Sequence, residues 1–153
     1  MEGIVLYVRE IWAGIMLLSG SIEDIRKRGF GRFFIVFMLA GTIAAICLSY
    51  SEIPDKNEIL SALTGAGAGL LLLPMCRLSD GAIGEGDAVF IACIGMIFGI
   101  SDCFQIFMYS LLFLAVFAVP AIASGKAGRH SSVPYIPFLA AGYALYIYTI
   151  YVL

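Results

Sequence analysis

The 153-residue sequence is 61% hydrophobic and 13% charged, with a formal net charge of −2 and a mean hydropathy of +0.99. A soluble domain is roughly half apolar and about one-quarter charged, so the composition argues against a soluble enzyme. Long apolar runs alternate with short polar clusters, as in helical proteins that cross a bilayer several times. We expect one integral-membrane domain over residues 1–153, with the lipid bilayer as a partner and no nucleic-acid partner.

A helix crosses the hydrocarbon core with about 20 apolar residues. The apolar stretches predict six crossings, and Ser101 and Asp102 divide a run that is too long for one helix. The fold class predicted is therefore an all-α membrane protein with six transmembrane helices and a short fourth helix. The expected helices are residues 4–22, 33–50, 59–76, 87–100, 103–123 and 134–153.

The basic residues predict the orientation, because Lys and Arg gather in cytoplasmic loops. Lys56 and Arg9 are the basic residues expected outside. The other seven of the nine lie in the first, third and fifth loops. These loops are therefore expected in the cytoplasm and both termini outside. The seven are Arg26, Lys27, Arg28, Arg32, Arg77, Lys126 and Arg129.

The third expected helix contains a glycine repeat from Gly65 to Gly69. Small residues let helices approach closely in lipid. Packing within the bundle is the favoured use of this repeat, and self-association remains an alternative, so the oligomeric state stays open.

Metal and cofactor sites are not expected. The four cysteines form no CxxC pair, and the single His130 has no His or Cys at ligand spacing.

Two aspartates stand out as candidate catalytic residues. Asp24 follows the first expected helix and Asp87 opens the fourth, 63 positions later. Two crossings separate them, so both return to the cytoplasmic face. Carboxylates at membrane depth are costly and usually functional. An aspartyl protease needs two carboxylates that can meet in this way.

Each aspartate also has a structural interpretation. Asp24 could flank a helix end and pair with Arg26 or Arg28, and Asp87 could be a carboxylate favoured at a helix N-terminus. Gly84 and Gly86 leave that second account incomplete, because glycines allow close approaches that a Cβ would block. A site that admits an extended peptide needs such room.

Three segments resemble the type IV prepilin peptidases and the related preflagellin peptidases. Residues 81–87, Gly-Ala-Ile-Gly-Glu-Gly-Asp, are similar to the GxGD motif of these enzymes. Residues 24–28, Asp-Ile-Arg-Lys-Arg, resemble their other catalytic segment. Residues 133–142, which include Pro137, resemble the start of their last helix, and Lys126 matches a lysine that often precedes it.

The resemblance implies an intramembrane aspartyl endopeptidase in a prokaryotic cytoplasmic (inner) membrane, with Asp24 and Asp87 as catalytic residues. Its substrate would be a pilin-like precursor whose basic leader is removed at the cytoplasmic face. Gly84, Glu85, Gly86, Lys126 and Pro137 are the expected substrate-binding residues.

Two departures from the family pattern limit what the resemblance implies. The run Phe30-Gly31-Arg32 replaces a common Ile-Pro-Asn sequence. The chain also has no counterpart of the cytoplasmic region with paired cysteines found in longer members. Methyltransferase activity is therefore not supported.

In such a dyad the two carboxyl groups share a proton, because like charges about 3 Å apart resist double ionisation. From helix dipoles alone, Asp87 at a helix N-terminus is the expected carboxylate, and Asp24 at a helix C-terminus is the expected acid.

Three alternative interpretations remain. Presenilin and signal peptide peptidase share GxGD but pair it with Tyr-Asp and Pro-Ala-Leu motifs, whereas Glu23 precedes Asp24 here. A small proton-coupled transporter could use Asp24 and Asp87 as relay carboxylates, although a relay should reach the membrane midplane. A structural assembly subunit would tolerate replacement of both aspartates.

Overall fold

The computed structural model describes residues 2–27, 29–49, 55–78, 84–123 and 133–152. Over these ranges the secondary structure is helical, and the all-α prediction is confirmed for them. The helices are α1 (Glu2–Lys27), α2 (Arg32–Ser49), α3 (Lys56–Leu78), α4 (Glu85–Phe98), α5 (Ile100–Ala123) and α6 (Ile136–Val152).

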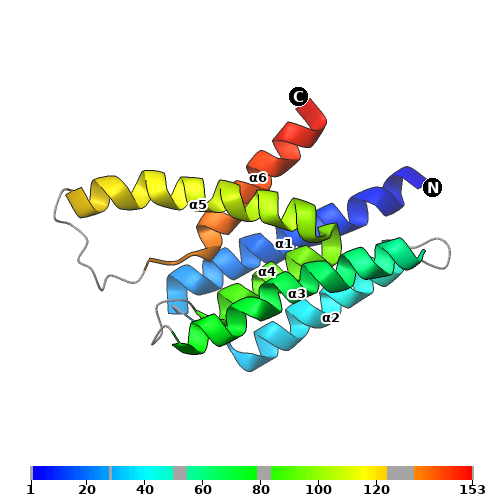
Figure 1. Ribbon diagram of the computed structural model, residues 1–153, viewed down its shortest axis with the longest axis horizontal. Helices are drawn as coiled ribbons and strands as arrows, with labels where there is room; N and C mark the ends of the chain where they lie inside the picture. Colours follow the sequence, from blue (N-terminus) through cyan, green and yellow to red (C-terminus); the bar gives the residue numbers. More distant parts are fainter. Residues whose placement is uncertain (1, 28, 50–54, 79–83, 124–132, 153) are drawn as a thin grey trace.

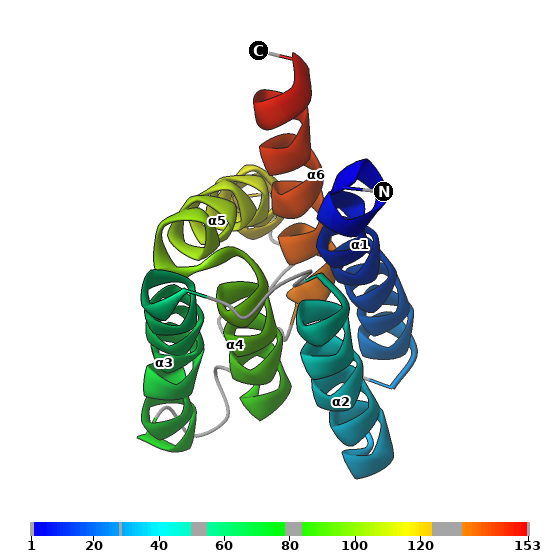
Figure 2. The same ribbon diagram turned by 90° about the vertical axis from the view of Figure 1, so that its right-hand side faces the viewer.

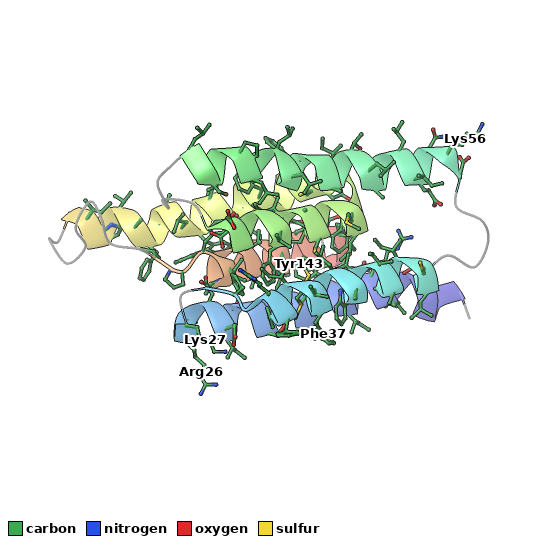
Figure 3. The ribbon with its side chains drawn as sticks, turned by 90° about the horizontal axis from the view of Figure 1, so that it is seen from below. Arg26, Lys27, Phe37, Lys56 and Tyr143 are labelled. Atoms are coloured by element: carbon green, nitrogen blue, oxygen red, sulfur yellow. The ribbon has the colours of Figure 1, made fainter. Side chains whose placement is uncertain are left out.

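Helices α1 to α5 run roughly along the length of the molecule, and α6 is inclined to them (Figure 1). The most extensive packing joins α3 to α4 and α5 to α6, and α1 packs on α2 and α6. Figure 2 shows α3 beside α4, and α1 beside α2. Arg26 and Lys27 lie at one end of the bundle and Lys56 at the other (Figure 3). The basic last turn of α1 and the start of α3 therefore lie at opposite ends of the bundle.

The first helix is longer than expected, since α1 continues to Lys27 rather than ending at residue 22. The last turn contains Arg26 and Lys27, whose positive charges are favourable at a helix C-terminus. Asp24 consequently lies within the helix and not after it, which corrects the predicted boundary.

The break between α4 and α5 falls at Gly99 and not at Ser101-Asp102. Gly99 has φ 85°, a left-handed conformation that favours glycine, and its N–H donates to Gly95 O at 2.8 Å. Asp102 lies instead in the first turn of α5, where a carboxylate is favourable. The prediction of a short fourth helix is confirmed, but the prediction that Ser101-Asp102 separates it from the fifth helix is wrong.

The glycine repeat of α3 serves contact with α4. Gly65 faces Gly95 so closely that a Cβ on either residue would overlap the backbone of the other. A Cβ on Gly69 would overlap the backbone of Ala92. The predicted use of these glycines in packing within the bundle is therefore confirmed for this contact.

Among the residues that the structure describes, two helical stretches are long and apolar enough to cross a membrane, Arg32–Ser49 and Ile100–Pro120. Only 17% of each stretch is buried inside the protein. A core helix of a soluble protein would be mostly buried, so these apolar surfaces need another covering. Large side chains such as Phe33, Phe37 and Val116 are exposed on them. Helix α6 is apolar as well but has 17 residues.

Candidate active site

Asp24 points into the bundle from the last part of α1. Its side chain is 7% exposed, and its Oδ2 accepts the N–H of Ile136 at 3.2 Å from a residue 112 positions away. Ile136 is the first residue of α6, and the first N–H groups of a helix have no partner within the helix. Asp24 thus supplies the acceptor that the start of α6 lacks.

The ion pair on this turn of α1 is formed by Glu23, the residue before Asp24, and not by Asp24. Glu23 Oε1 lies 2.6 Å from Lys27 Nζ on an exposed face. Of the two expected salt-bridge partners of Asp24, Arg28 lies outside the described residues. The structure therefore gives Asp24 a role at the helix interface, through Ile136, rather than at the surface.

Asp87 lies in the first turn of α4. Gly84 precedes that helix in an extended conformation, φ −71° and ψ 136°, and Gly84 O accepts the N–H of Asp87 at 3.1 Å. The side chain of Asp87 is half-buried. Asp24 is near enough for its charge to act on Asp87. The starts of α4 and α6 and the end of α1 therefore meet at one end of the bundle, called the aspartate end here.

The two glycines before Asp87 leave room for two different groups. A Cβ on Gly84 would lie 3.2 Å from Asp87 Oδ2, so this glycine accommodates the carboxylate itself. A Cβ on Gly86 would overlap the ring of Phe30. The close approach at Gly86 is thus filled by a side chain of this protein.

The other predicted substrate-binding residues have mixed placements. Glu85 is the exposed first residue of α4. Pro137 is the half-buried second residue of α6, where its missing N–H costs nothing. Lys126 lies outside the described residues. Beside Pro137, the Tyr135 hydroxyl lies 2.5 Å from Ser110 Oγ of α5, which ties the start of α6 to α5.

Several residues of this site were missed by the sequence reasoning. Ile136 acts through a backbone N–H, so its residue type carries no signal of the role. Phe30 stands out in the sequence only as a departure from a family pattern. Phe90 of α4, whose ring centroid lies 5.1 Å from that of Phe30, is one apolar residue among many in the sequence. Each of these side chains acquires its neighbours only when helices distant in sequence pack together.

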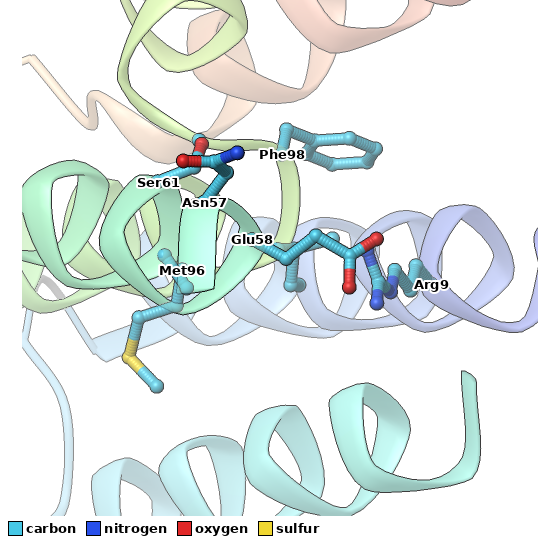
Figure 4. Close-up of a pocket in the computed structure, with 9 residues that line it drawn as sticks. Arg9, Asn57, Glu58, Ser61, Met96 and Phe98 are labelled. Atoms are coloured by element: carbon cyan, nitrogen blue, oxygen red, sulfur yellow. The ribbon is translucent and has the colours of Figure 1, made fainter. Parts of the chain in front are cut away.

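A pocket of about 250 Å³ lies at the opposite end of the bundle, where Arg9 of α1 meets the start of α3 and the end of α4. Figure 4 shows Glu58 and Arg9 turned toward each other beside Phe98. The aspartates do not line it. Over the described residues no group of three or more His, Cys, Asp or Glu side chains could hold a metal ion.

Comparison with known proteins gives two findings. A model of the type IV leader peptidase family matches residues 11–119. The chain is 29% identical over 135 residues to a prepilin leader peptidase/N-methyltransferase of Bacillus subtilis, covering 87% of this chain and 52% of that protein. It therefore spans about half the length of this curated relative. No solved structure gives a significant match.

Proposed function

Because the chain belongs to the type IV leader peptidase family, we propose that it is an intramembrane aspartyl endopeptidase that removes the basic leader of a pilin-like precursor. Asp24 and Asp87 are its catalytic residues. The observation that carries this proposal is the approach of two carboxylates, from α1 and α4, at one end of the bundle.

The chemistry requires one carboxylate and one carboxylic acid. The carboxylate takes a proton from water, and the water oxygen attacks the scissile carbonyl carbon. The carboxylic acid donates a hydrogen bond to the carbonyl oxygen as negative charge develops there. The tetrahedral intermediate then collapses with cleavage of the C–N bond, and the leaving amine takes the proton that the first carboxylate received from water. A pair of neighbouring aspartates can hold these two states at once, because they resist double ionisation.

We assign the carboxylate to Asp24 and the acid to Asp87, which reverses the assignment expected from helix dipoles. That expectation considered only the helix to which each residue belongs. Asp24 also accepts an N–H from the start of α6, and a hydrogen bond to the charged form stabilises it. Both aspartates therefore lie beside a helix N-terminus, Asp87 in the first turn of α4 and Asp24 against the first N–H of α6.

The proposed membrane arrangement has six crossings, with the aspartate end in the cytoplasm and both termini outside, within one domain over residues 1–153. The apolar surfaces of α2 and α5 support immersion in lipid. Arg26 and Lys27 at the aspartate end support its cytoplasmic placement, because basic residues gather on that side.

The proposed substrate approaches from the cytoplasm. The exposed carboxylate of Glu85 precedes Asp87 by two residues, and it is suited to attract a basic leader. Lys126 and Pro137 remain predicted contacts, and Gly84 acts through Asp87. The ring of Phe30 occupies the space beside Gly86 that the sequence analysis assigned to substrate.

The proposal is tested by co-expression with a precursor that carries a basic leader before an apolar helix. Leader removal is followed by the mass of the precursor. Asp24→Ala and Asp87→Ala should each abolish cleavage, while Asp55→Asn, an exposed carboxylate at the start of α3, should retain it. Unimpaired cleavage by either alanine variant rejects the dyad.

A proton relay is the less supported function. It would need titratable groups along the bundle, but the largest fully buried side chains are apolar or neutral, including Met16, Leu17, Ile94 and Leu139. Among the described residues, Asp24 is the buried carboxylate, and it lies at one end. Proton uptake by reconstituted vesicles that depends on Asp24 would favour the relay.

A further inference from the structure

Two phenylalanine rings at the aspartate end pack on glycines. A Cβ on Gly20 of α1 would lie 2.6 Å from Phe90 Cε1 of α4 and still closer to its Cζ. A Cβ on Gly86 of α4 would lie 2.6 Å from Phe30 Cε2 and still closer to its Cδ2. Both rings thus take space that any other residue would fill at these two positions.

These contacts are reciprocal around the two aspartates. Asp24 lies between Gly20 and Phe30 in the chain, and Asp87 lies between Gly86 and Phe90. Each segment therefore carries a glycine, an aspartate and a phenylalanine in that order. The phenylalanine of each segment packs on the glycine of the other.

The rings have little freedom to move aside. Phe90 is 2% exposed. Phe30 packs against Phe90 with ring centroids 5.1 Å apart, and stacks on Phe34 of α2 at 5.8 Å with an interplanar angle of 14°. Close-packed side chains resist insertion of even one methyl group. A Cβ at Gly20 must consequently displace a buried ring, and a Cβ at Gly86 must displace the half-buried ring of Phe30, which packs between Phe34 and Phe90.

The geometry points to Phe30 and Phe90 as positioning residues that set the separation of Asp24 and Asp87 through their contacts with Gly86 and Gly20. The inference rests on the proposed function, in which the aspartates are the catalytic pair. Such a pair needs accurate spacing, since a misplacement of about 1 Å can reduce a rate about 100-fold. The contact of Gly20 with Phe90 joins α1 to α4, and the contact of Phe30 with Gly86 joins the segment after α1 to the same helix.

The role of Gly86 follows from this arrangement. If Gly86 serves substrate entry, a methyl group there should weaken substrate binding whatever residue stands at position 30. If Gly86 serves the ring of Phe30, a smaller and more flexible side chain at position 30 should relieve the methyl group. The two roles therefore predict opposite results for a double variant.

The experiment compares Gly86→Ala, Phe30→Leu and the double variant in cleavage of a basic-leader precursor. Gly86→Ala should lower kcat by about 10- to 100-fold with little change in KM. Phe30→Leu should itself lower kcat by about 3- to 10-fold, because the ring that sets the spacing of the aspartates is lost. The double variant should return to the level of Phe30→Leu instead of multiplying the two losses. Gly14→Ala is the control, since its Cβ meets Tyr143 Cε1 at an ordinary 3.8 Å.

A double variant that remains as slow as Gly86→Ala, or a Gly86→Ala variant that raises KM alone, would overturn the inference. The second pair, Gly20→Ala with Phe90→Leu, should behave in the same way.

Thermal unfolding of the same purified proteins separates this inference from the proposed function. Gly86→Ala should lower Tm by about 5 °C, and Phe30→Leu should restore most of that loss in the double variant. If the wild type cuts no basic-leader precursor, the proposed function and the positioning role both fail, and the Tm cycle still decides the contact. If cleavage occurs without coupling in either measurement, only the positioning role is rejected.

Discussion

At the aspartate end, the buried carboxylate of Asp24 accepts a backbone N–H from Ile136. At the far end, near the pocket, the half-buried Glu10 accepts hydrogen bonds from the hydroxyl groups of two tyrosines of α6. Tyr151 donates to its carboxylate Oε1 at 2.5 Å, and Tyr143 donates to its backbone oxygen at 2.8 Å. Both acidic residues therefore join α1 to α6, at different points along the same helix pair.

The difference lies in what surrounds each acid. Asp24 has a second carboxylate, Asp87, within range of its charge, and rigid aromatic contacts near both. Glu10 is paired with phenolic donors, which can satisfy a carboxylate and hold a helix in place. A pair of interacting carboxylates costs stability and is typical of catalysis, whereas a carboxylate with hydroxyl donors is typical of structure. The predictions below test this division.

The largest contrast should come from isosteric removal of one charge at each end. Asp24→Asn should reduce leader cleavage by at least about 1,000-fold, because a general base is lost. Glu10→Gln should leave kcat/KM within about threefold, since an amide oxygen still accepts the hydroxyl of Tyr151. Cleavage rates of the two purified variants provide the measurement. Equal losses of kcat/KM in the two variants would contradict a catalytic role for Asp24 beside a structural role for Glu10.

Stability should depend strongly on the far half of α3 and α4. Gly65→Ala should lower the free energy of unfolding by about 1–3 kcal/mol, because its Cβ overlaps the backbone of Gly95. Gly67→Ala is the matched control, since nothing lies within 4 Å of its added Cβ. Thermal unfolding in detergent compares them. The activity of the folded fraction of Gly65→Ala should remain close to that of the wild type.

The N–H of Ile136 should support the rate of cleavage. Ile136→Pro removes this donor at a helix position that tolerates proline, whereas Ile136→Val keeps it. The carboxylate of Asp24 then loses a hydrogen bond that orients it, so kcat/KM should fall by about 10-fold in Ile136→Pro and stay close to the wild type in Ile136→Val. An unchanged kcat/KM in Ile136→Pro would contradict Asp24 as the base.

The smallest effects should come from two tyrosine hydroxyls, one at each end. Tyr135→Phe loses the contact with Ser110, and Tyr151→Phe loses the bond to Glu10. Each should reduce the free energy of unfolding by about 0.5–1.5 kcal/mol. Only Tyr135→Phe should also slow cleavage, because Tyr135 precedes the residue that donates to Asp24. A slower Tyr151→Phe enzyme of normal stability would link the far end to catalysis.

The order and approximate extent of the helices could be predicted from the sequence, because apolar runs are a local property. Their ends were less predictable. Helix α1 ends at Lys27, whose charge is favourable in the last turn, and α4 ends before Gly99, which adopts a left-handed conformation. Polar residues such as Asp102 are poor guides, since they are favourable inside a first helical turn as well as between helices.

The aspartates could be singled out from the sequence, while their partners could not. Asp24 and Asp87 are rare charges beside apolar helices, and the number of intervening crossings predicts that they share one end. The donor from Ile136 and the ring of Phe30 carry no comparable signal, because a backbone N–H and an apolar ring occur throughout the chain. Their roles arise from proximity alone.

By itself, the sequence determined the helical class, the family and the two candidate catalytic carboxylates, because these follow from residue types and their spacing. Tertiary structure decided which groups surround the carboxylates. Only the packing of α1, α4 and α6 brings the N–H of Ile136 to Asp24 and the ring of Phe30 to Gly86. Hydrogen bonding and steric contact act over a few ångströms, so they depend on neighbours in space rather than on neighbours in sequence.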